Sequence, residues 1–288
     1  MRTLHAMVLS LTILGSAGTV LAQLLPPNAS GVTMGHLHYK VRDVDANKKF
    51  WMALGATPVK IDALEALKFH SVFVFLDKAA SSGGTEGSVV NHVGFRVPNT
   101  RQELERLKAA GYKTELAASG TGKVGSVYSP EGERIEFLED MSVNVKFVPD
   151  KGTYVQAGKM TDRIILHHIH LYVPENSVEK AKAWYVKVFS GVPGKRYKTE
   201  DPPYEAVDIP GVNMNFAEAH GALAPIKGRM LDHIGFEVKN LEVFCKRLEA
   251  NGIKLDSPYK RLPSGVAMAF LTDPWGTYIE LTEGLDRY

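Results

Sequence analysis

The stretch that decides the fold is Asp232-His-Ile-Gly-Phe-Glu-Val238, because it repeats an earlier one, Asn91-His-Val-Gly-Phe-Arg-Val97. Three more segments recur in the same order. They are HLHYKV at 36–41 with HIHLYV at 168–173, RLKAAGYK at 106–113 with RLEANGIK at 247–254, and PEGERIE at 130–136 with PWGTYIE at 274–280. The offsets between matched residues are 132 (168 − 36), 141 (233 − 92) and 144 (280 − 136). Two homologous modules that differ by small loop insertions therefore account for the chain.

Within each module the apolar pattern switches between period 2 and period 3.6 in a set order. A strand with histidine near its start leads into a helix, predicted at 45–54 and 177–189, and short strands follow, among them 71–76 and 212–217. A second half repeats this order with the strand at His92 or His233, a helix such as 102–110 closed by Gly111, and two strands that end in a glutamate. Each module thus reads as βαβββ written twice, which predicts the α+β class.

The N-terminus has the features of a secretory signal. Arg2 precedes an apolar run from Ala6 to Leu14, and Val20-Leu-Ala22 forms a small-residue cleavage site. We expect residues 1–22 to be a Sec-type signal peptide cleaved after Ala22, and the mature protein to be secreted or periplasmic. The run is too short for a comfortable membrane span and no second one follows, so no membrane partner is expected after cleavage. The expected boundaries are a leader at 23–32, a first module at 33–140, a linker at 141–163 and a second module at 164–288.

Composition excludes some partners. The 34 basic and 32 acidic residues nearly balance, and no basic stripe follows the chain, so nucleic acid is not an expected partner. Cys245 is the only cysteine, which excludes an intramolecular disulfide. Its helical spacing beside Phe244 and Leu248 indicates a small buried apolar residue.

The polar faces of the predicted strands carry histidines and glutamates. Because successive side chains of a strand alternate between faces, His36 and His38 share one face, as do His168 and His170. Apolar neighbours flank the glutamate of each last strand, so its carboxylate needs a partner when it leaves water. Two imidazoles and one carboxylate form the facial arrangement used for non-haem iron, with positions left open for a substrate.

These motifs, in this order, resemble the vicinal oxygen chelate superfamily, which includes glyoxalase I, bleomycin resistance proteins and extradiol dioxygenases. The resemblance runs from about Thr33 to Glu283. It implies two tandem modules, each a pair of βαβββ units that form a cup-shaped curved mixed sheet with the helices outside. It also implies one divalent ion per active module, with Fe²⁺ or Mn²⁺ favoured and Zn²⁺ or Ni²⁺ as alternatives. The implied ligands are His36, His92 and Glu136 in the first module, and His168, His233 and Glu280 in the second.

Other polar residues near these positions are candidates for handling substrate. His38 and His170 lie two residues after an implied ligand on the same strand face, so either is a candidate general base or hydrogen-bond partner, as is Tyr172. An alternative role for both histidines is to support the ligands or fill the cavity. Asn213, Asn215 and His220 are candidate substrate-binding residues in the second module.

The leading functional hypothesis is a metal-dependent, dioxygenase-like enzyme that chelates a small oxygen-bearing substrate, with its chemistry in the second module. Glyoxalase I and the related epimerases usually add a fourth, acidic ligand, and neither Val72–Phe75 nor Val212–Asn215 carries an acid. Ring-cleaving members carry a tyrosine where Phe270 stands and a histidine near Arg261–Pro263, two departures that count against catechol cleavage. A glyoxalase- or epimerase-type lyase or isomerase, and a non-catalytic binding protein, remain as alternatives. The protein is expected to be a monomer or a homodimer.

Overall fold

The computed structural model describes residues 24–61, 64–118, 122–139, 146–149, 163–197 and 204–288. The predicted signal peptide lies outside these ranges, and so does most of the predicted linker. Among the described residues, no helix is both long and apolar enough to cross a lipid bilayer.

Four βαβββ units follow one another along the chain, which confirms the order predicted from the periodicity. Unit 1 comprises β1 (Val32–Val41), α1 (Val44–Leu54), β2 (Thr57–Ile61), β3 (Leu64–Lys68) and β4 (Phe73–Lys78). Unit 2 comprises β5 (Val90–Val97), α2 (Thr100–Ala109), β6 (Thr114–Leu116), β7 (Val124–Tyr128) and β8 (Arg134–Glu139). Unit 3 comprises β10 (Ile165–Pro174), α3 (Val178–Phe189), β11 (Val192–Tyr197), β12 (Tyr204–Ile209) and β13 (Val212–Ala219). Unit 4 comprises β14 (Leu231–Val238), α4 (Leu241–Ala250), β15 (Ser257–Arg261), β16 (Ala267–Thr272) and β17 (Tyr278–Glu283), and a short 3₁₀ turn, η1 (Leu285–Arg287), follows it.

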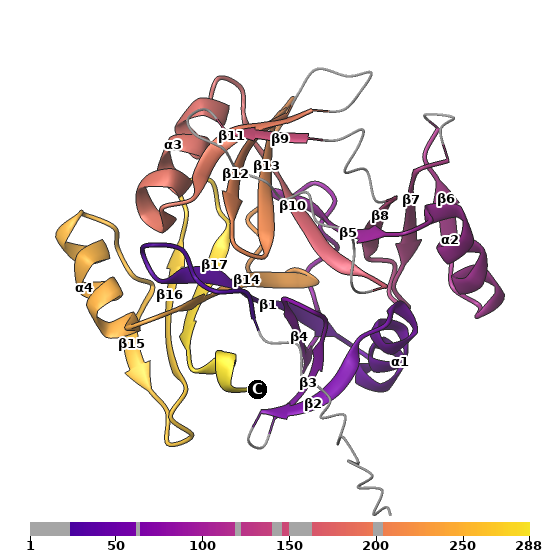
Figure 1. Ribbon diagram of the computed structural model, residues 1–288, viewed down its shortest axis with the longest axis horizontal. Coiled ribbons are helices and arrows are strands. Elements are labelled where there is room, and N and C mark those ends of the chain that lie inside the picture. The colour runs from indigo at the N-terminus through magenta and orange to yellow at the C-terminus, as the bar shows by residue number, and fades with distance from the viewer. Residues whose placement is uncertain (1–23, 62–63, 119–121, 140–145, 150–162, 198–203) are drawn as a thin grey trace, which may run out of the picture.

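The units form two mixed sheets, which confirms the α+β class. The first sheet has the strand order β15-β16-β17-β14-β1-β4-β3-β2, and the second has the order β6-β7-β8-β5-β10-β13-β12-β11-β9. In Figure 1 the indigo strands of unit 1 accordingly lie beside the orange and yellow strands of unit 4. Strand β9 (Lys146–Pro149), in the segment predicted as linker, pairs with β11.

The pairing of units differs from the prediction that each module forms its own cup. β1 of the first module pairs with β14 of the second, and β10 pairs with β5, so each sheet combines one unit from each module. The β1–β14 ladder is close at Gly35, where a Cβ atom would lie 2.9 Å from the Glu237 nitrogen. A glycine is required there because the two backbones approach too closely for any side chain.

The two units of one module contact each other through the hydrophobic core. Trp51 of α1 packs against Phe95 of β5, with ring centroids 6.2 Å apart, and Phe189 of α3 packs against Phe236 of β14 at 4.7 Å. All four side chains are essentially buried in one continuous cluster. The hydrophobic core therefore joins the two units of one module, whereas the two sheets join one module to the other.

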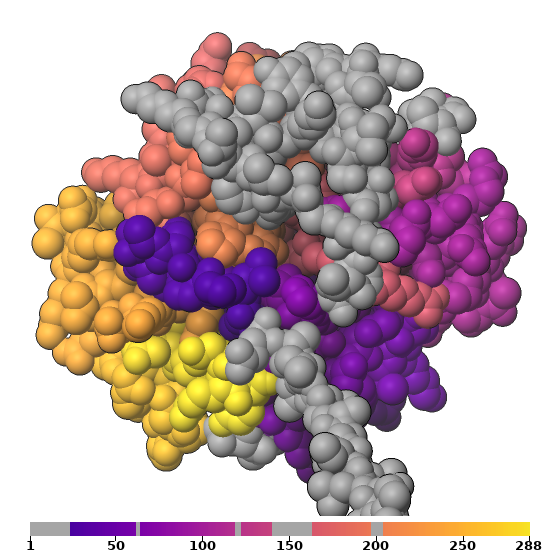
Figure 2. All heavy atoms as spheres, in the orientation of Figure 1, coloured from indigo at the N-terminus to yellow at the C-terminus, as the bar shows by residue number. Residues whose placement is uncertain are grey.

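The two ends of the described chain meet at the open side of the first sheet. Leu24 of the predicted leader and Leu285 of η1 are buried in a small apolar cluster with Phe73 of β4. Lys68 donates a hydrogen bond to the carbonyl oxygen of Tyr288. Figure 2 shows the yellow C-terminal residues at the surface next to the indigo N-terminal segment.

Candidate metal centre

The six predicted ligands gather in two clusters, one on each sheet. The first centre consists of His36 and His38 on β1, His233 on β14 and Glu280 on β17. The second centre consists of His168 and His170 on β10, His92 on β5 and Glu136 on β8. In each cluster, the donor atoms of the grouped histidines, and of Glu280 in the first, lie within 4.8 Å of one another.

The predicted grouping by module is therefore wrong. His36 meets His233 and Glu280, which belong to the other module, and His168 meets His92 and Glu136. The reason is that each sheet contains one unit from each module. The ligands that meet are those on the same sheet, and they come from different modules. The chemistry predicted for the second module alone thus requires a histidine from the first.

The glycine of the His-x-Gly-Phe motif makes room for a histidine of the other module. At Gly235, which pairs with His36 across the β1–β14 ladder, a Cβ atom would lie 2.0 Å from the His36 ring. At Gly94 it would lie 2.2 Å from the ring of His168. Each motif therefore supplies one ligand and also the glycine against which the ring of a second ligand packs.

Three donors of the first centre point at one spot. Nε2 of His36 lies 3.0 Å, and Nε2 of His233 lies 2.9 Å, from the same oxygen, Oε2 of Glu280. All three residues are buried, with at most 7% of their surface exposed. Their side chains come from three adjacent strands, so the sheet itself holds the arrangement.

The protonation of this cluster favours a cation at its middle. Burial alone would raise the pKa of Glu280, but His36 and His233 outweigh it and hold that pKa well below its usual range. Burial lowers the pKa of His36, so its ring is neutral at physiological pH. Burial also acts to lower the pKa of His233, but hydrogen bonds with Asp232 and Glu280 outweigh this effect and raise it. An ionised carboxylate with imidazole nitrogens directed beside it suits a divalent ion that binds nitrogen and oxygen.

Asp232 orients the His233 ring. Its Oδ1 lies 2.8 Å from His233 Nδ1, and its Oδ2 accepts from Lys40 Nζ at 2.8 Å and from the Gly228 backbone at 2.7 Å. A carboxylate at Nδ1 holds the proton there and leaves the Nε2 lone pair for a metal. The residues of the first centre thus fit a metal ion, including the support behind one ligand.

Replacing Asp232 by asparagine is expected to weaken binding of a divalent ion at the first centre by about 10- to 100-fold. The amide cannot match the charge that keeps His233 Nδ1 protonated and the Nε2 atom basic. Competition against a fluorescent chelator would measure the affinity. Lys40→Met is the control, because it removes only the outer partner of the carboxylate and should cost less; equal losses in both variants would contradict this role.

Aromatic rings surround the first centre on two sides. Phe73 and Phe75 of β4 pair with His36 and His38, and the Phe75 ring lies edge-on to the His36 ring at 5.1 Å. On the other side, Phe270 and Tyr278 stack on each other and present their edges to His233. The centre therefore combines three strong candidate ligands with apolar walls.

His38 stands beside the three ligands, as expected for a residue of the same strand face. Its ring centroid lies 4.4 Å from that of His233. Burial, followed by the neighbouring histidines, lowers the pKa of His38 to about 3, so the ring is neutral at physiological pH. A neutral imidazole at this place can accept or donate one hydrogen bond toward a bound molecule.

The predicted second-module site residues are spread over different roles. His170 is buried and stacks on Tyr172 at 5.2 Å beside the second centre. Asn213 is fully buried, where it accepts from Arg196 and donates to Asp208, so its amide holds other side chains in place. Asn215 lies opposite His170, and its buried Oδ1 has no partner.

His220 lies apart from both centres. It is largely exposed, and its Nδ1 lies 3.1 Å from Glu175. It follows the end of β13, seven residues beyond Asn213, which in an extended chain is about 23 Å. The structure thus does not bring His220 to the cluster with which it was predicted to act.

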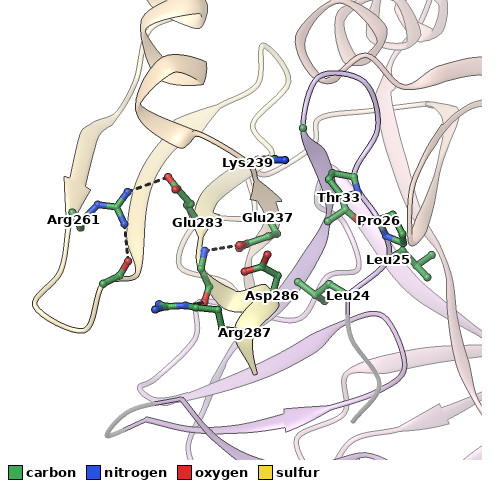
Figure 3. A pocket seen from close by; sticks show the side chains of 14 residues that line it. Leu24, Leu25, Pro26, Thr33, Glu237, Lys239, Arg261, Glu283, Asp286 and Arg287 are labelled. Carbon is green, nitrogen blue, oxygen red and sulfur yellow. Dashed lines mark hydrogen bonds and ion pairs between the residues drawn. The ribbon is translucent and has the colours of Figure 1, made fainter. Parts of the chain in front are cut away.

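A cavity lies next to the first centre along the β1–β14 ladder, where Thr33 pairs with Glu237. It measures about 670 Å³, and Thr33, Glu237 and Arg261 are among its lining residues. Figure 3 shows the Glu237 carboxylate directed at the backbone of the C-terminal turn. That carboxylate accepts from the amides of Gly284 and Leu285 and from the Thr282 hydroxyl.

Glu237 is expected to make the protein less stable as pH rises from 5 to 8. Burial raises its pKa from 4.5 to about 7, so the unfolded chain ionises first, and the stability present below pH 4.5 is lost as pH approaches 7. The shift corresponds to roughly 3 kcal/mol in the free energy of unfolding. Urea unfolding of Glu237→Gln should show a correspondingly weaker pH dependence, and an unchanged one would contradict the assignment.

The residues that support the ligands were not predicted from the sequence. Asp232, Lys40, Arg134 and Arg196 each contact a histidine or its hydrogen-bond partner. The one available signal was position, because Asp232 and Asn91 directly precede the histidines of the repeated motif. Nothing in the periodicity reveals Arg196, which reaches its partner from another strand.

Comparison with known proteins supports the resemblance. Residues 165–281 match the family model described as Glyoxalase/Bleomycin resistance protein/Dioxygenase superfamily. The second module belongs to this superfamily. Curated protein sequences give no match to the chain.

Solved structures show the same fold over most of the chain. Glyoxalase I from Zea mays superposes with a TM-score of 0.63 at 15% identity, covering 89% of this chain and 94% of the other. A mutant of that enzyme gives 0.66 at 14% identity, covering 89% and 95%. A provisionally assigned dioxygenase from Bacillus subtilis gives 0.58 at 14% identity, covering 87% and 85%. At such identities the likeness establishes the shared fold alone.

Proposed function

We propose that this protein is a divalent-metal-dependent enzyme whose small substrate binds through two oxygen atoms at His36, His233 and Glu280. The observation that carries the proposal is the convergence of two imidazole nitrogens on one buried carboxylate oxygen, with Asp232 behind one of the rings. Fe²⁺ or Mn²⁺ suits this ligand set best, with Zn²⁺ and Ni²⁺ as alternatives. When bound, such an ion supplies Lewis-acid polarisation of a chelated oxygen or activation of dioxygen.

The protein's own residues select and hold the substrate. The edges of Phe75 and Phe270 form apolar walls, which favour a substrate with an unsaturated or aliphatic body beside its two oxygens. His38 is the neutral group placed to hold or receive a proton from a substrate hydroxyl. Charged sugars or phosphates have no matching group among these residues.

Dioxygen chemistry is the reaction type that the ligand set favours. Three protein ligands leave positions for a chelating substrate and for dioxygen, and Phe73 and Phe75 occupy the strand that would supply a fourth acid. An isomerase or lyase acting by proton transfer is the competing candidate, and the neutral His38 beside the ligands is the observation that favours it.

The test begins with the chain prepared without chelator and reconstituted separately with Fe²⁺, Mn²⁺, Zn²⁺ and Ni²⁺. Oxygen consumption is expected with the Fe²⁺ form and bidentate oxygen probes such as 2-oxo acids, and it should be absent in Glu280→Gln. Turnover of 2-hydroxycarbonyl probes without oxygen consumption would instead support the isomerase or lyase. Failure to bind any of the four ions would overturn the proposal.

A further inference from the structure

We propose that the second centre is a hydrogen-bonded histidine relay held by Arg196, and that it does not serve as a metal site. The inference rests on the proposed function in one respect, since it assigns the single ion of the protein to the first centre. It narrows the expectation of one ion per active module to a single centre.

Arg196 sets the direction of the first hydrogen bond. Its Nη1 lies 2.8 Å from Nε2 of His167, and a guanidinium can only donate, so that nitrogen accepts. An accepting nitrogen carries no proton, and an imidazole ring in a protein keeps at least one. The proton must therefore sit on Nδ1 of His167.

The next step fixes His168. Nδ1 of His167 lies 2.8 Å from Nδ1 of His168, so the first donates and the second accepts. Because Nδ1 of His168 accepts, the proton of this ring lies on Nε2. That nitrogen lies 3.1 Å from His92 Nε2 and 3.5 Å from Glu136 Oε2. Arg134 donates to His92 Nδ1, so His92 also carries its proton on Nε2, and both rings direct this proton toward Glu136. The atom that would have to bind a metal is thus the one that carries the proton.

Arg196 is itself held firmly. It is 5% exposed, and its Nε donates to Oδ1 of Asn213, whose amide donates in turn to Asp208. Moving the His168 proton to Nδ1 would place two donors face to face, either between the rings or between His167 and Arg196. Binding a metal through Nε2 therefore requires breaking a buried hydrogen bond.

The first centre has no histidine at the position that matches His167. Both first strands carry a register irregularity just before the ligand, between Met34 and His36 and between Leu166 and His168. The residue at that irregularity is Gly35 in one sheet and His167 in the other. Nε2 of His36 donates to the Glu280 carboxylate, but its Nδ1 is buried without a hydrogen-bonding group that would oppose a proton there. The proton can therefore move to Nδ1 when an ion binds at Nε2.

The net charge around the two centres also differs, and the difference favours a cation at the first centre. Asp232 and Glu280 outnumber Lys40 at the first centre. At the second, Asn91 replaces the aspartate and Arg134 replaces Tyr278, with its Nη2 2.7 Å from both Asn91 Oδ1 and His92 Nδ1. The two arginines there, Arg134 and Arg196, balance the charge of the two carboxylates, Glu136 and Asp208. No net negative charge therefore attracts a dication.

The relay can be tested directly by NMR on the wild-type chain. Long-range ¹H–¹⁵N correlations are expected to show His168 protonated on Nε2 with an unprotonated Nδ1, and His167 protonated on Nδ1. A proton on Nδ1 of His168 would overturn the relay. This readout needs no metal, so it stands even if the proposed function fails.

Metal titration of the full chain tests the consequence. Wild type is expected to bind one Zn²⁺ or Fe²⁺ tightly, Glu136→Gln to keep that ion, and Glu280→Gln to lose it. Two tightly bound ions, one of them lost with Glu136→Gln, would overturn the proposal. No tight ion in wild type together with the predicted NMR pattern would reject the proposed function while leaving the relay intact.

Releasing the relay should create a second site. Arg196→Met and His167→Gly, the latter matching Gly35, are each expected to raise affinity for a second ion by at least about tenfold, and Glu136→Gln added to either should remove the gain. Lys195→Met is the control on the same strand, since Lys195 pairs with Glu205 away from the relay. An unchanged second affinity in both folded variants would contradict the role of Arg196.

Discussion

Replacing Glu280 by glutamine is expected to lower the affinity for a divalent ion at the first centre by more than about 100-fold. The carboxylate is the one anionic ligand there, and both His36 and His233 point at its Oε2 atom. The amide keeps the shape of the side chain but not the charge. Equilibrium dialysis with metal analysis would measure the loss.

Glu136→Gln is the matched control, because Glu136 ends the same repeated motif in the other module. It should leave the tightly bound ion in place. Circular dichroism and thermal unfolding of both variants would show that the comparison is between folded proteins. If Glu136→Gln releases the ion and Glu280→Gln retains it, the assignment of the first centre is wrong.

Gly235→Ala is expected to lower metal affinity more than tenfold by displacing a ligand that belongs to the other module. A Cβ atom would lie 2.0 Å from the His36 ring, which is 1% exposed and has no free space to enter. The overpacking should also cost on the order of 1–3 kcal/mol in the free energy of unfolding. Calorimetric metal titration and urea unfolding would measure the two effects.

Gly94→Ala provides the control, because its Cβ atom would meet His168 in the second centre. It should destabilise the fold to a similar degree and leave the affinity for the ion unchanged. If the sheets were formed within modules, Gly235 would instead support His168, and Gly94 would support His36. A loss of the ion in Gly94→Ala with retention in Gly235→Ala would therefore contradict the exchanged pairing.

The turn at Asp273-Pro-Trp-Gly276 supports a ligand of the first centre without contacting the ion site. Asp273 accepts hydrogen bonds from the amides of Trp275, Gly276 and Thr277, and from the Tyr185 hydroxyl. Its role is to close the turn before β17, which aims Glu280 at the centre. It supports the ligand and does not favour one module over the other as the seat of chemistry.

The leader illustrates what composition alone leaves open. Residues 23–32 were expected to form an ordered or flexible leader; within its described part Asn28 donates to the carbonyl oxygen of Phe189, and Leu24 is buried against the C-terminal turn. Proline and polar residues in this stretch indicate a loop. Their contacts depend on chain segments more than 150 residues away, and no local pattern encodes those.

The sequence by itself determined the four βαβββ units, the α+β class and the identity of the six candidate ligands. These features depend on local periodicity and on a repeat, and both are legible along the chain. Which histidines share a centre was decided only by the tertiary structure. The motifs at His92 and His233 present nearly the same strand, with a glycine at the same place, so β1 can pair with either by hydrogen bonding alone.

The choice between the two partners is made by contacts distant in sequence. Trp51 packs on Phe95 and thereby places units 1 and 2 back to back across the core, while the β1–β14 ladder brings units 1 and 4 edge to edge. Tertiary structure also decides the difference between the two centres, because Arg196 reaches His167 from β11 and no spacing in the sequence predicts this contact. Local periodicity reports which face a side chain takes, but the partner on that face is set by packing of the whole chain.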